Sequence, residues 1–406
     1  MISHKLRTRS IAAFFVGAVA VTASLPGAAS AAPPAQPQRP VCPGPVGLDA
    51  ARCHAHVVTD AKGTPNAASA PKGYGPAQFR GAYQLPAGAT TPQTIAIVDA
   101  YDDPKIESDL GIYSSTFGLP PCTTTSGCFR KVNQSGNAGP YPRSDSGWAL
   151  EIALDVEVAH AICPNCKILL VEAANNSLTN LAAAVNTAAK LGATEISNSY
   201  GGSEFSSEVS DSAYNHPGIA VTASSGDNGY GLFGYPAASP YVISVGGTTL
   251  SLGPENSYGG ETAWSGGGSG CSSYVSAPAW QAADPNWTLT GCGTKRAVAD
   301  VAADADPSSG AAVYDTLKYQ GRSGWFQVGG TSLSAPLIAG VYALAGNAAS
   351  FPYPAAALYS HQLDSPATLH DVTGGSNGSC PTIMCSAGTH YDGPTGVGTP
   401  SGVGAF

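Results

Sequence analysis

Charged side chains are scarce in this chain of 406 residues, since Asp, Glu, Lys and Arg together make up only 11% of it. Basic residues are the scarcer kind, and the formal net charge is -9 at pH 7. Proteins that bind nucleic acid need a basic face for the phosphates, so this charge excludes nucleic acid as the main partner. Few charges also limit self-repulsion when carboxylates titrate, which suits a protein that works in acidic media.

Apolar runs long enough to span a bilayer are absent after residue 31. The chain begins with Lys5, Arg7 and Arg9, continues with an apolar run at 11–25, and then has an Ala-Ser-Ala site at 29–31. This order is typical of a secretory signal peptide; a membrane anchor is the alternative, but the run is short for one. We therefore expect residues 1–31 to be a signal peptide, and the mature protein to be secreted, extracellular and free of the membrane.

The ten cysteines lie in close pairs along the sequence. In an exported chain, an even count in local pairs predicts disulfides. The Cys-Pro-Asn-Cys stretch has two alternatives, a redox motif or half a zinc site, but no second Cys-x-x-Cys accompanies it. The predicted pairs are Cys42/Cys53, Cys122/Cys128, Cys163/Cys166, Cys271/Cys292 and Cys380/Cys385.

Two parts come after the signal peptide. Residues 32–71 are rich in Ala, Pro and Gly without periodicity, which predicts a flexible leader or short pro-segment. Over 72–406, apolar strands alternate with helices, which predicts a single α/β domain whose mostly parallel central sheet is flanked by helices on both faces. The predicted strands are 94–101, 167–173, 193–201, 218–227 and 241–250, and the predicted helices are 147–161, 178–192 and 331–349.

Ser332 lies at the start of the last of these helices, in the stretch Gly-Gly-Thr-Ser-Leu-Ser-Ala-Pro. Free backbone N–H groups at a helix start can hold an anionic oxygen, and Gly329 and Gly330 let a substrate approach closely. The alternative is a simple helix-capping serine. The longer stretch favours a nucleophile.

A nucleophilic serine needs a base, and the usual histidine motif is missing. Subtilisin-like proteases share the Gly-Thr-Ser pattern and carry their base in a His-Gly-Thr-His context, which none of the eight histidines here has. His160 is on the relevant helix, but near its C-terminal end, where the helix dipole favours a structural role.

The same helix carries Glu151 and Asp155, which are four residues apart and so share one face. Their neighbours are apolar, so we expect this face to be buried and the two acids to share protons. Such carboxyls are suited to acid–base work. Asp227 comes after a predicted strand; subtilisin-like enzymes have an oxyanion-binding Asn at this point, and a turn residue is the alternative.

Taken together, these motifs resemble the sedolisin family of serine-carboxyl peptidases, which have a subtilisin-like fold and act in acid. The resemblance covers roughly residues 72–406 and keeps the family's order. The motifs that carry it lie at 147–168, 195–201, 224–229, 259–272, 277–281, 300–307, 329–336, 371–378 and 387–400.

The resemblance implies that Glu151 is the general base toward Ser332, that Asp155 orients Glu151, and that Asp227 contributes to the oxyanion hole. The implied reaction is peptide-bond hydrolysis through an acyl-enzyme in acid, where the base is ionised and Asp227 is neutral. Asp99, at the tip of a predicted strand, is either structural or part of the buried acidic network.

The resemblance also implies one structural Ca²⁺ ion, held by two carboxylates and three backbone carbonyls. Oxygen ligands of these kinds suit calcium. His390 stands where the family usually has glycine. The implied ligands are Asp371, Val372, Gly388, His390 and Asp392.

Several expectations about function remain open. The family usually has a large N-terminal prodomain, whereas only a short leader is expected here. We expect a monomeric endopeptidase acting on proteins or peptides. The alternatives are a tripeptidyl-peptidase of the same family, a histidine-dependent subtilisin-like protease, and a catalytically silent exported binding protein.

Overall fold

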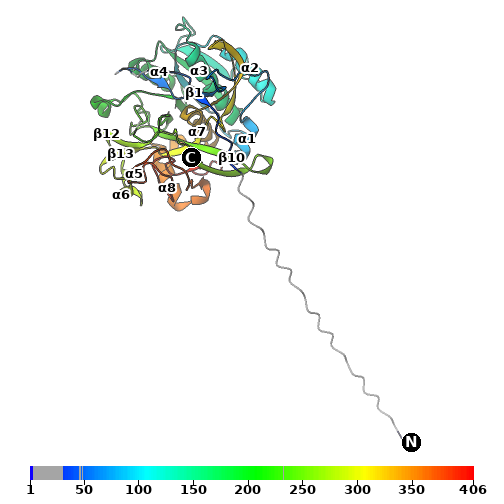
Figure 1. Cartoon of the computed structure of the whole chain (residues 1–406), viewed down its shortest axis with the longest axis vertical. Helices are drawn as coiled ribbons and strands as arrows, with labels where there is room; N and C mark the ends of the chain where they lie inside the picture. Colours follow the sequence, from blue (N-terminus) through cyan, green and yellow to red (C-terminus); the bar gives the residue numbers. More distant parts are fainter. Residues whose placement is uncertain (3–30, 45–46, 48, 232) are drawn as a thin grey trace.

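The computed structural model describes residues 1–2, 31–44, 47, 49–231 and 233–406 (Figure 1). The predicted signal peptide at 1–31 therefore lies almost entirely outside the described residues. Within the described part of the chain, no helix has both the length and the apolarity that a bilayer crossing requires.

An eight-stranded sheet forms the centre of the molecule, with the order β11-β10-β9-β7-β4-β6-β5 and with β14 also paired to β10. Every pairing in it is parallel except that of β10 with β11. This confirms the predicted mostly parallel sheet. The strands are β4 (Thr94–Ala100), β5 (Phe129–Asn133), β6 (Lys167–Ala173), β7 (Glu195–Asn198), β9 (Ala220–Ser224), β10 (Ile243–Leu252), β11 (Tyr258–Ala263) and β14 (Val301–Asp304).

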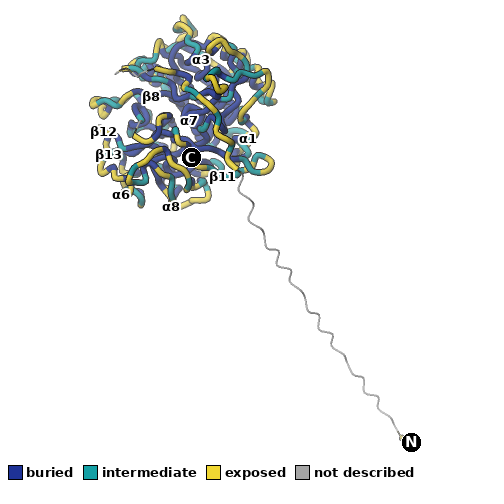
Figure 2. The backbone as a smooth tube through the Cα atoms, viewed as in Figure 1, coloured by how far each residue is buried: buried dark blue, intermediate teal, exposed yellow. Residues whose placement is uncertain are grey.

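Helices flank this sheet, as predicted. Two of them, α3 and α7, pack against each other and are buried along nearly their whole length (Figures 1 and 2). The α-helices are α1 (Pro76–Ala82), α2 (Ile106–Phe117), α3 (Ser146–Ile162), α4 (Leu178–Lys190), α5 (Ala279–Ala282), α6 (Trp287–Thr290), α7 (Thr331–Ala345) and α8 (Ala355–Asp364). Four short 3-10 helices lie at Ser206–Ser210, Pro254–Asn256, Ala348–Ser350 and Pro366–Thr368.

The prediction of a flexible leader over 32–71 is wrong for much of that segment. Three short strands lie in it, and Val41, Ala55 and Val57 are completely buried in the main core. The leader joins a four-stranded sheet of order β1-β3-β16-β15, while β2 pairs with β8. These strands are β1 (Gln38–Pro40), β2 (Arg52–Cys53), β3 (His56–Val58), β8 (Tyr200–Gly201), β15 (Ala311–Tyr319) and β16 (Arg322–Gly329).

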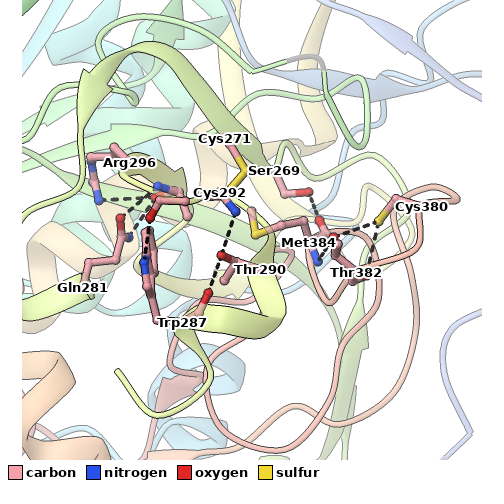
Figure 3. Close-up of a disulfide and its surroundings, with 12 residues drawn as sticks. Ser269, Cys271, Gln281, Trp287, Thr290, Cys292, Arg296, Cys380, Thr382 and Met384 are labelled. Atoms are coloured by element: carbon pink, nitrogen blue, oxygen red, sulfur yellow. Dashed lines mark hydrogen bonds between the residues drawn. A yellow bond between two sulfur atoms is a disulfide. The ribbon is translucent and has the colours of Figure 1, made fainter. Parts of the chain in front are cut away.

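All five predicted disulfides are present, including Cys163–Cys166 in the Cys-Pro-Asn-Cys turn. Figure 3 shows the Cys271–Cys292 disulfide, which ties β12 (Gly270–Ser276) to the end of α6. Nearby, β12 pairs with β13 (Lys295–Val298), and β17 (Leu369–His370) pairs with β18 (Thr399–Pro400). The C-terminal part of the chain is therefore fastened by short local links.

Candidate active site

Ser332 is completely buried at the second residue of α7. The helix begins after Gly330, whose φ of 101° is in the left-handed region that favours glycine. A Cβ on Gly330 would lie 2.1 Å from the His54 carbonyl oxygen and 2.5 Å from Oδ2 of Asp227. Glycine is thus required here both by the backbone conformation and by the close approach of these two oxygens.

The hydroxyl and the amide of Ser332 point to two different carbonyl groups. Oγ donates to the carbonyl oxygen of Ser199, at 3.1 Å, and the backbone N–H donates to the carbonyl oxygen of His54, at 3.0 Å. The backbone N–H of Ser332, at the start of α7, is therefore already hydrogen-bonded to a peptide carbonyl. This is the donor geometry that an oxyanion hole needs.

Glu151 and Asp155 lie one turn apart on α3 and are completely buried, as predicted. Burial, then the nearby carboxyls of Asp155 and Asp99, raise the pKa of Glu151 well above its usual range. The Ser332 hydroxyl is close enough to oppose that rise, although its hydrogen bond is made to Ser199.

The other two carboxyls of this group behave similarly. Burial raises the pKa of Asp155 well above its usual range, and the Ser199 hydroxyl opposes this. Burial, followed by Asp155 and then Glu172, raises the pKa of Asp99. The carboxyl oxygens of Asp99, Glu151 and Asp155 have no hydrogen-bond partner among the described residues. We call these three residues the acid cluster; Asp99, left open by the sequence, belongs to it.

Asp227 comes after β9 and faces the start of α7. Its Oδ1 accepts hydrogen bonds from the amide and the hydroxyl of Thr331, both at 2.8 Å, whereas Oδ2 has no partner among the described residues. Burial raises the pKa of Asp227 to about 7, against the hydrogen bonds from Thr331. A proton on this free oxygen would make it a hydrogen-bond donor beside the His54 carbonyl.

Two histidines of the leader also lie at this site, and sequence reasoning missed them. Nδ1 of His54 lies 2.8 Å from Oγ of Ser224, and Nε2 of His56 lies 3.8 Å from Oδ2 of Asp227. Burial lowers the pKa of His54 to about 3 and that of His56 to about 4, so both rings are neutral in mild acid. Neither ring is hydrogen-bonded to the Ser332 hydroxyl. The apolar β-branched pair after His56 was the one sequence signal of a strand here.

His160 is not hydrogen-bonded to Ser332. Its Nε2 is 3.0 Å from the carbonyl oxygen of Pro120. It also lies beside Cys122 and Cys128, and these three are the one group of metal-binding side chains in the described residues. The two cysteines form a disulfide, so they offer no thiolate to a metal.

The predicted calcium ligands gather in one loop. Asp371 accepts a hydrogen bond from the amide of His390, at 3.0 Å, and Asp392 accepts one from the amide of Gly388, at 2.9 Å. His390 has φ 63°, which explains why a glycine suits this position.

The carbonyl groups of the loop divide into two sets. Those of Thr389 and Tyr391 accept hydrogen bonds from the Asn286 side chain. The carbonyls of Val372, Gly388 and His390 accept none from the described residues. The residues present therefore fit a cation with oxygen ligands.

Comparison with known proteins supports the fold. Residues 136–367 match the model of the subtilase family. Sedolisin from Pseudomonas sp. (strain 101) is 28% identical over 373 residues, covering 82% of this chain and 60% of the relative. Kumamolisin from Bacillus sp. (strain MN-32) is 32% identical over 367 residues, covering 82% of this chain and 63% of the relative. The chain thus spans about three-fifths of the length of these relatives.

A solved structure of Pseudomonas sedolisin, a serine-carboxyl proteinase in complex with two molecules of pseudo-iodotyrostatin, superposes with a TM-score of 0.68. It is 28% identical, and the match covers 82% of this chain and 96% of that one. The chain belongs to the subtilase family, and its sequence is similar to those of sedolisin and kumamolisin.

Proposed function

We propose that the protein is a secreted endopeptidase that hydrolyses peptide bonds in acid, with Ser332 as nucleophile and Glu151 as general base. The observation that carries this proposal is the buried Glu151–Asp155 pair, with Glu151 close to Ser332 and no imidazole of the described residues bonded to the hydroxyl. The substrates are proteins or peptides, and the protein acts as a monomer.

The proposed reaction begins when Glu151 accepts the proton of the Ser332 hydroxyl and Oγ attacks the carbonyl carbon of the substrate. The negative oxygen that forms is stabilised by the amide of Ser332 and by the proton on Oδ2 of Asp227. Glu151 then gives its proton to the leaving amine. Water hydrolyses the acyl-enzyme in a second step of the same kind. Asp155, one turn from Glu151, shares protons with it and orients it.

This chemistry requires acid for a reason that the site supplies. Asp227 donates a hydrogen bond only while protonated, and burial sets its pKa at about 7. Activity should therefore decline as the pH rises through about 7. A serine–histidine enzyme has the opposite limit, because its imidazole is protonated and lost as a base in acid.

Substitution of the nucleophile and of the base tests the proposal directly. Ser332→Ala should abolish peptide hydrolysis, and Glu151→Gln should reduce it nearly as much, because the amide cannot accept the proton. The measurement is kcat/KM for a peptide library between pH 3 and 8, with melting temperatures to show that each variant is folded.

His160→Ala is the matched control, since it lies on the same helix as Glu151 but contacts Pro120. If His160→Ala lowers kcat/KM more than Glu151→Gln does, the carboxyl mechanism is wrong. Labelling of Ser332 by a peptide aldehyde separates the enzyme from a catalytically silent binding protein, which would show no Ser332-dependent adduct.

Two further parts of the proposal concern the setting of the enzyme. Secretion is supported by the N-terminal sequence pattern and by five disulfides, which persist in oxidising compartments. The loop of Asp371, Gly388, His390 and Asp392, with the carbonyl of Val372, is proposed to hold one structural Ca²⁺. Its role is to brace the C-terminal loops, and no catalytic step involves it.

A further inference from the structure

The leader runs through the active site as an extended strand. Arg52 and Cys53 pair antiparallel with Gly201 and Tyr200, and the amide of His54 continues the ladder by donating to the carbonyl of Ser199, at 3.2 Å. Addition of a strand to an existing edge is a common way for a protein to bind an extended peptide. The backbone of residues 52–54 is therefore held as a bound peptide would be.

The next group along the leader is the carbonyl of His54, and it lies at the catalytic machinery. Its oxygen accepts the hydrogen bond from the Ser332 amide, at 3.0 Å. The same oxygen and Oδ2 of Asp227 both lie within 2.5 Å of a single point, the Cβ position of Gly330. The His54 oxygen thus occupies the position assigned to the oxyanion, between its two proposed donors.

The chain is held on the far side of this carbonyl as well. The carbonyl of Ala55 accepts a hydrogen bond from the Val41 amide, at 2.8 Å, and β3 then pairs with β16 through His56 and Gly329. The peptide bond between His54 and Ala55 is therefore fixed from both directions. Firm positioning of this kind favours reaction at that bond.

The His54 side chain has a shaped site of its own. Its ring lies against Gly201, where a Cβ would approach Cε1 to 2.7 Å, and its Nδ1 meets Ser224 Oγ at 2.8 Å. Gly201 thus leaves room for this ring. A cavity of about 240 Å³ opens beside the ring and is lined in part by Arg52, Gly202 and Phe233.

We propose that the bond between His54 and Ala55 is a self-cleavage site, and that residues 32–54 block the cleft until that bond is cut. This rests on the proposed function of the site. Ser332 Oγ bonds to the His54 carbonyl carbon, the bond to the Ala55 nitrogen breaks, and Glu151 gives the Ser332 proton to that nitrogen. One water then hydrolyses the ester, leaving a carboxylate on His54 and a free amine on Ala55.

The Cys42–Cys53 disulfide lies entirely upstream of the proposed cut. Because both of its cysteines precede the His54–Ala55 bond, no covalent link would join residues 32–54 to the rest of the chain after cleavage. The severed residues 32–54 would be held by non-covalent contacts alone, namely the pairing with β3 and β8, other hydrogen bonds such as that of Ala51 with Asn176, and buried side chains. Its departure would uncover Ser332.

The path of the leader also bears on the type of peptidase. The chain upstream of the proposed cleavage site extends beyond a third residue, since Ala51 donates to the carbonyl of Asn176 at 2.8 Å and the carbonyl of Ala50 passes close to Gly202. A tripeptidyl-peptidase would need this end of the cleft to be closed after three residues. The observed path supports endopeptidase action.

The test is to incubate the purified secreted chain at pH 4 and to follow its amino-terminal sequence and intact mass with time. We expect a new terminus, Ala-His-Val-Val, beginning at Ala55. Ser332→Ala should keep the longer chain, and Glu151→Gln serves as a second variant that preserves the hydroxyl. Peptide hydrolysis by the wild type should appear together with the new terminus or after it.

A proline variant separates cleavage from the rest of the chemistry. Ala55→Pro should block the cut and leave peptide hydrolysis lost, with the melting temperature reporting that the fold is kept. Ala61→Pro is the matched control, because Ala61 is in an exposed turn and donates no hydrogen bond among the described residues. It should be processed like the wild type.

The outcomes distinguish the two proposals. A wild type that hydrolyses added peptides while keeping a terminus upstream of Ala55, or that is cut at another bond, overturns the self-cleavage site and leaves the proposed function standing. Cutting of Ser332→Ala at the wild-type rate also overturns the site, because another protease would then be responsible. If the wild type cuts neither its own chain nor added peptides, the proposed function itself fails.

Discussion

At the residue scale, the candidate site is characterised by three buried carboxyl groups that have no positively charged partner among the described residues. Asp99, Glu151 and Asp155 are completely buried, and none of them forms an ion pair among the described residues. Such groups remain in a core by keeping or sharing protons. A hydroxyl beside them gains a proton acceptor only when the cluster gives up a proton, so the ionisation of the cluster sets the lower pH limit of the proposed reaction.

Asp227 gives the sharpest residue-scale prediction. Its two oxygens have different roles, since Oδ1 accepts from Thr331 and Oδ2 is free of partners among the described residues. Asn can copy both, with its carbonyl accepting from Thr331 and its amide donating at every pH. Asp227→Asn should therefore keep part of its activity and extend it above pH 7, as measured by the pH dependence of kcat/KM. An unchanged upper limit would show that Asp227 is not the protonated donor.

Ser332, Glu151 and Asp155 could be proposed from the sequence because each lies in a local motif on a helix that the pattern also predicts. Sequence reasoning missed His54 because nothing near this residue in the sequence shows its neighbours in space. Its ring partner, Ser224, is 170 residues away. Contacts of this range depend on the whole fold, and a single sequence does not reveal them.

At the scale of elements, buried helices and strands were predicted well. The expected helix at 147–161 is α3, and the expected helix at 331–349 ends earlier, at Gly346, where φ is 68°. Short strands were predicted poorly, since β1, β2 and β3 have two or three residues each and too little pattern to detect. Each of them is held by pairing with a strand distant or nearby in the chain, β1 with β3, β2 with β8 and β3 with β16.

The loop closed by Cys42 and Cys53 carries an element-scale prediction. A disulfide over a short loop stabilises by about 2 to 4 kcal/mol, mainly through the unfolded state of that loop. Replacing both cysteines with serine should let residues 32–54 leave sooner once the His54–Ala55 bond is cut, so that peptide hydrolysis follows the new Ala55 terminus with a shorter delay. The equivalent double change at Cys122 and Cys128, which lie outside the leader, is the control. A longer delay between the cut and the onset of hydrolysis than in the wild type would contradict this role.

The loop between Asp371 and Asp392 carries a second element-scale prediction. Removal of a bound Ca²⁺ should leave the two carboxylates and the free carbonyls of Gly388 and His390 without their shared partner. A chelator should then lower the melting temperature of the Ser332→Ala protein, and added Ca²⁺ should restore it. Equal melting temperatures with and without chelator would count against a calcium ion here.

Across the whole molecule, buried acids outnumber buried cations among the described residues, and this sets how stability depends on pH. Burial is the largest cause that raises the pKa of Asp103 to about 7, of Asp315 and Glu195 to about 8, and of Glu172 to about 9. In the unfolded chain these groups ionise near pH 4. Between those limits the folded state binds more protons, so each rise in pH through this window removes stability.

Buried neutral histidines act in the opposite direction. The pKa values of His54 and His56 are lowered to about 3 and about 4. These two groups therefore reduce the stability of the folded protein as the pH falls below about 6.5. Because the acids are more numerous, we expect the melting temperature of Ser332→Ala, chosen to prevent self-digestion, to fall between pH 5 and 9. Calorimetry over that range is the measurement, and a melting temperature that rises with pH would contradict the expectation.

Strand order in the smaller sheet has a consequence for the mature molecule. In the order β1-β3-β16-β15, β3 is an interior strand only while β1 is beside it. Loss of residues 32–54 would leave β3 as an edge strand, with amide and carbonyl groups facing outward. The space that β1 occupied lies directly beside this edge, so the backbone of an incoming polypeptide could pair with β3.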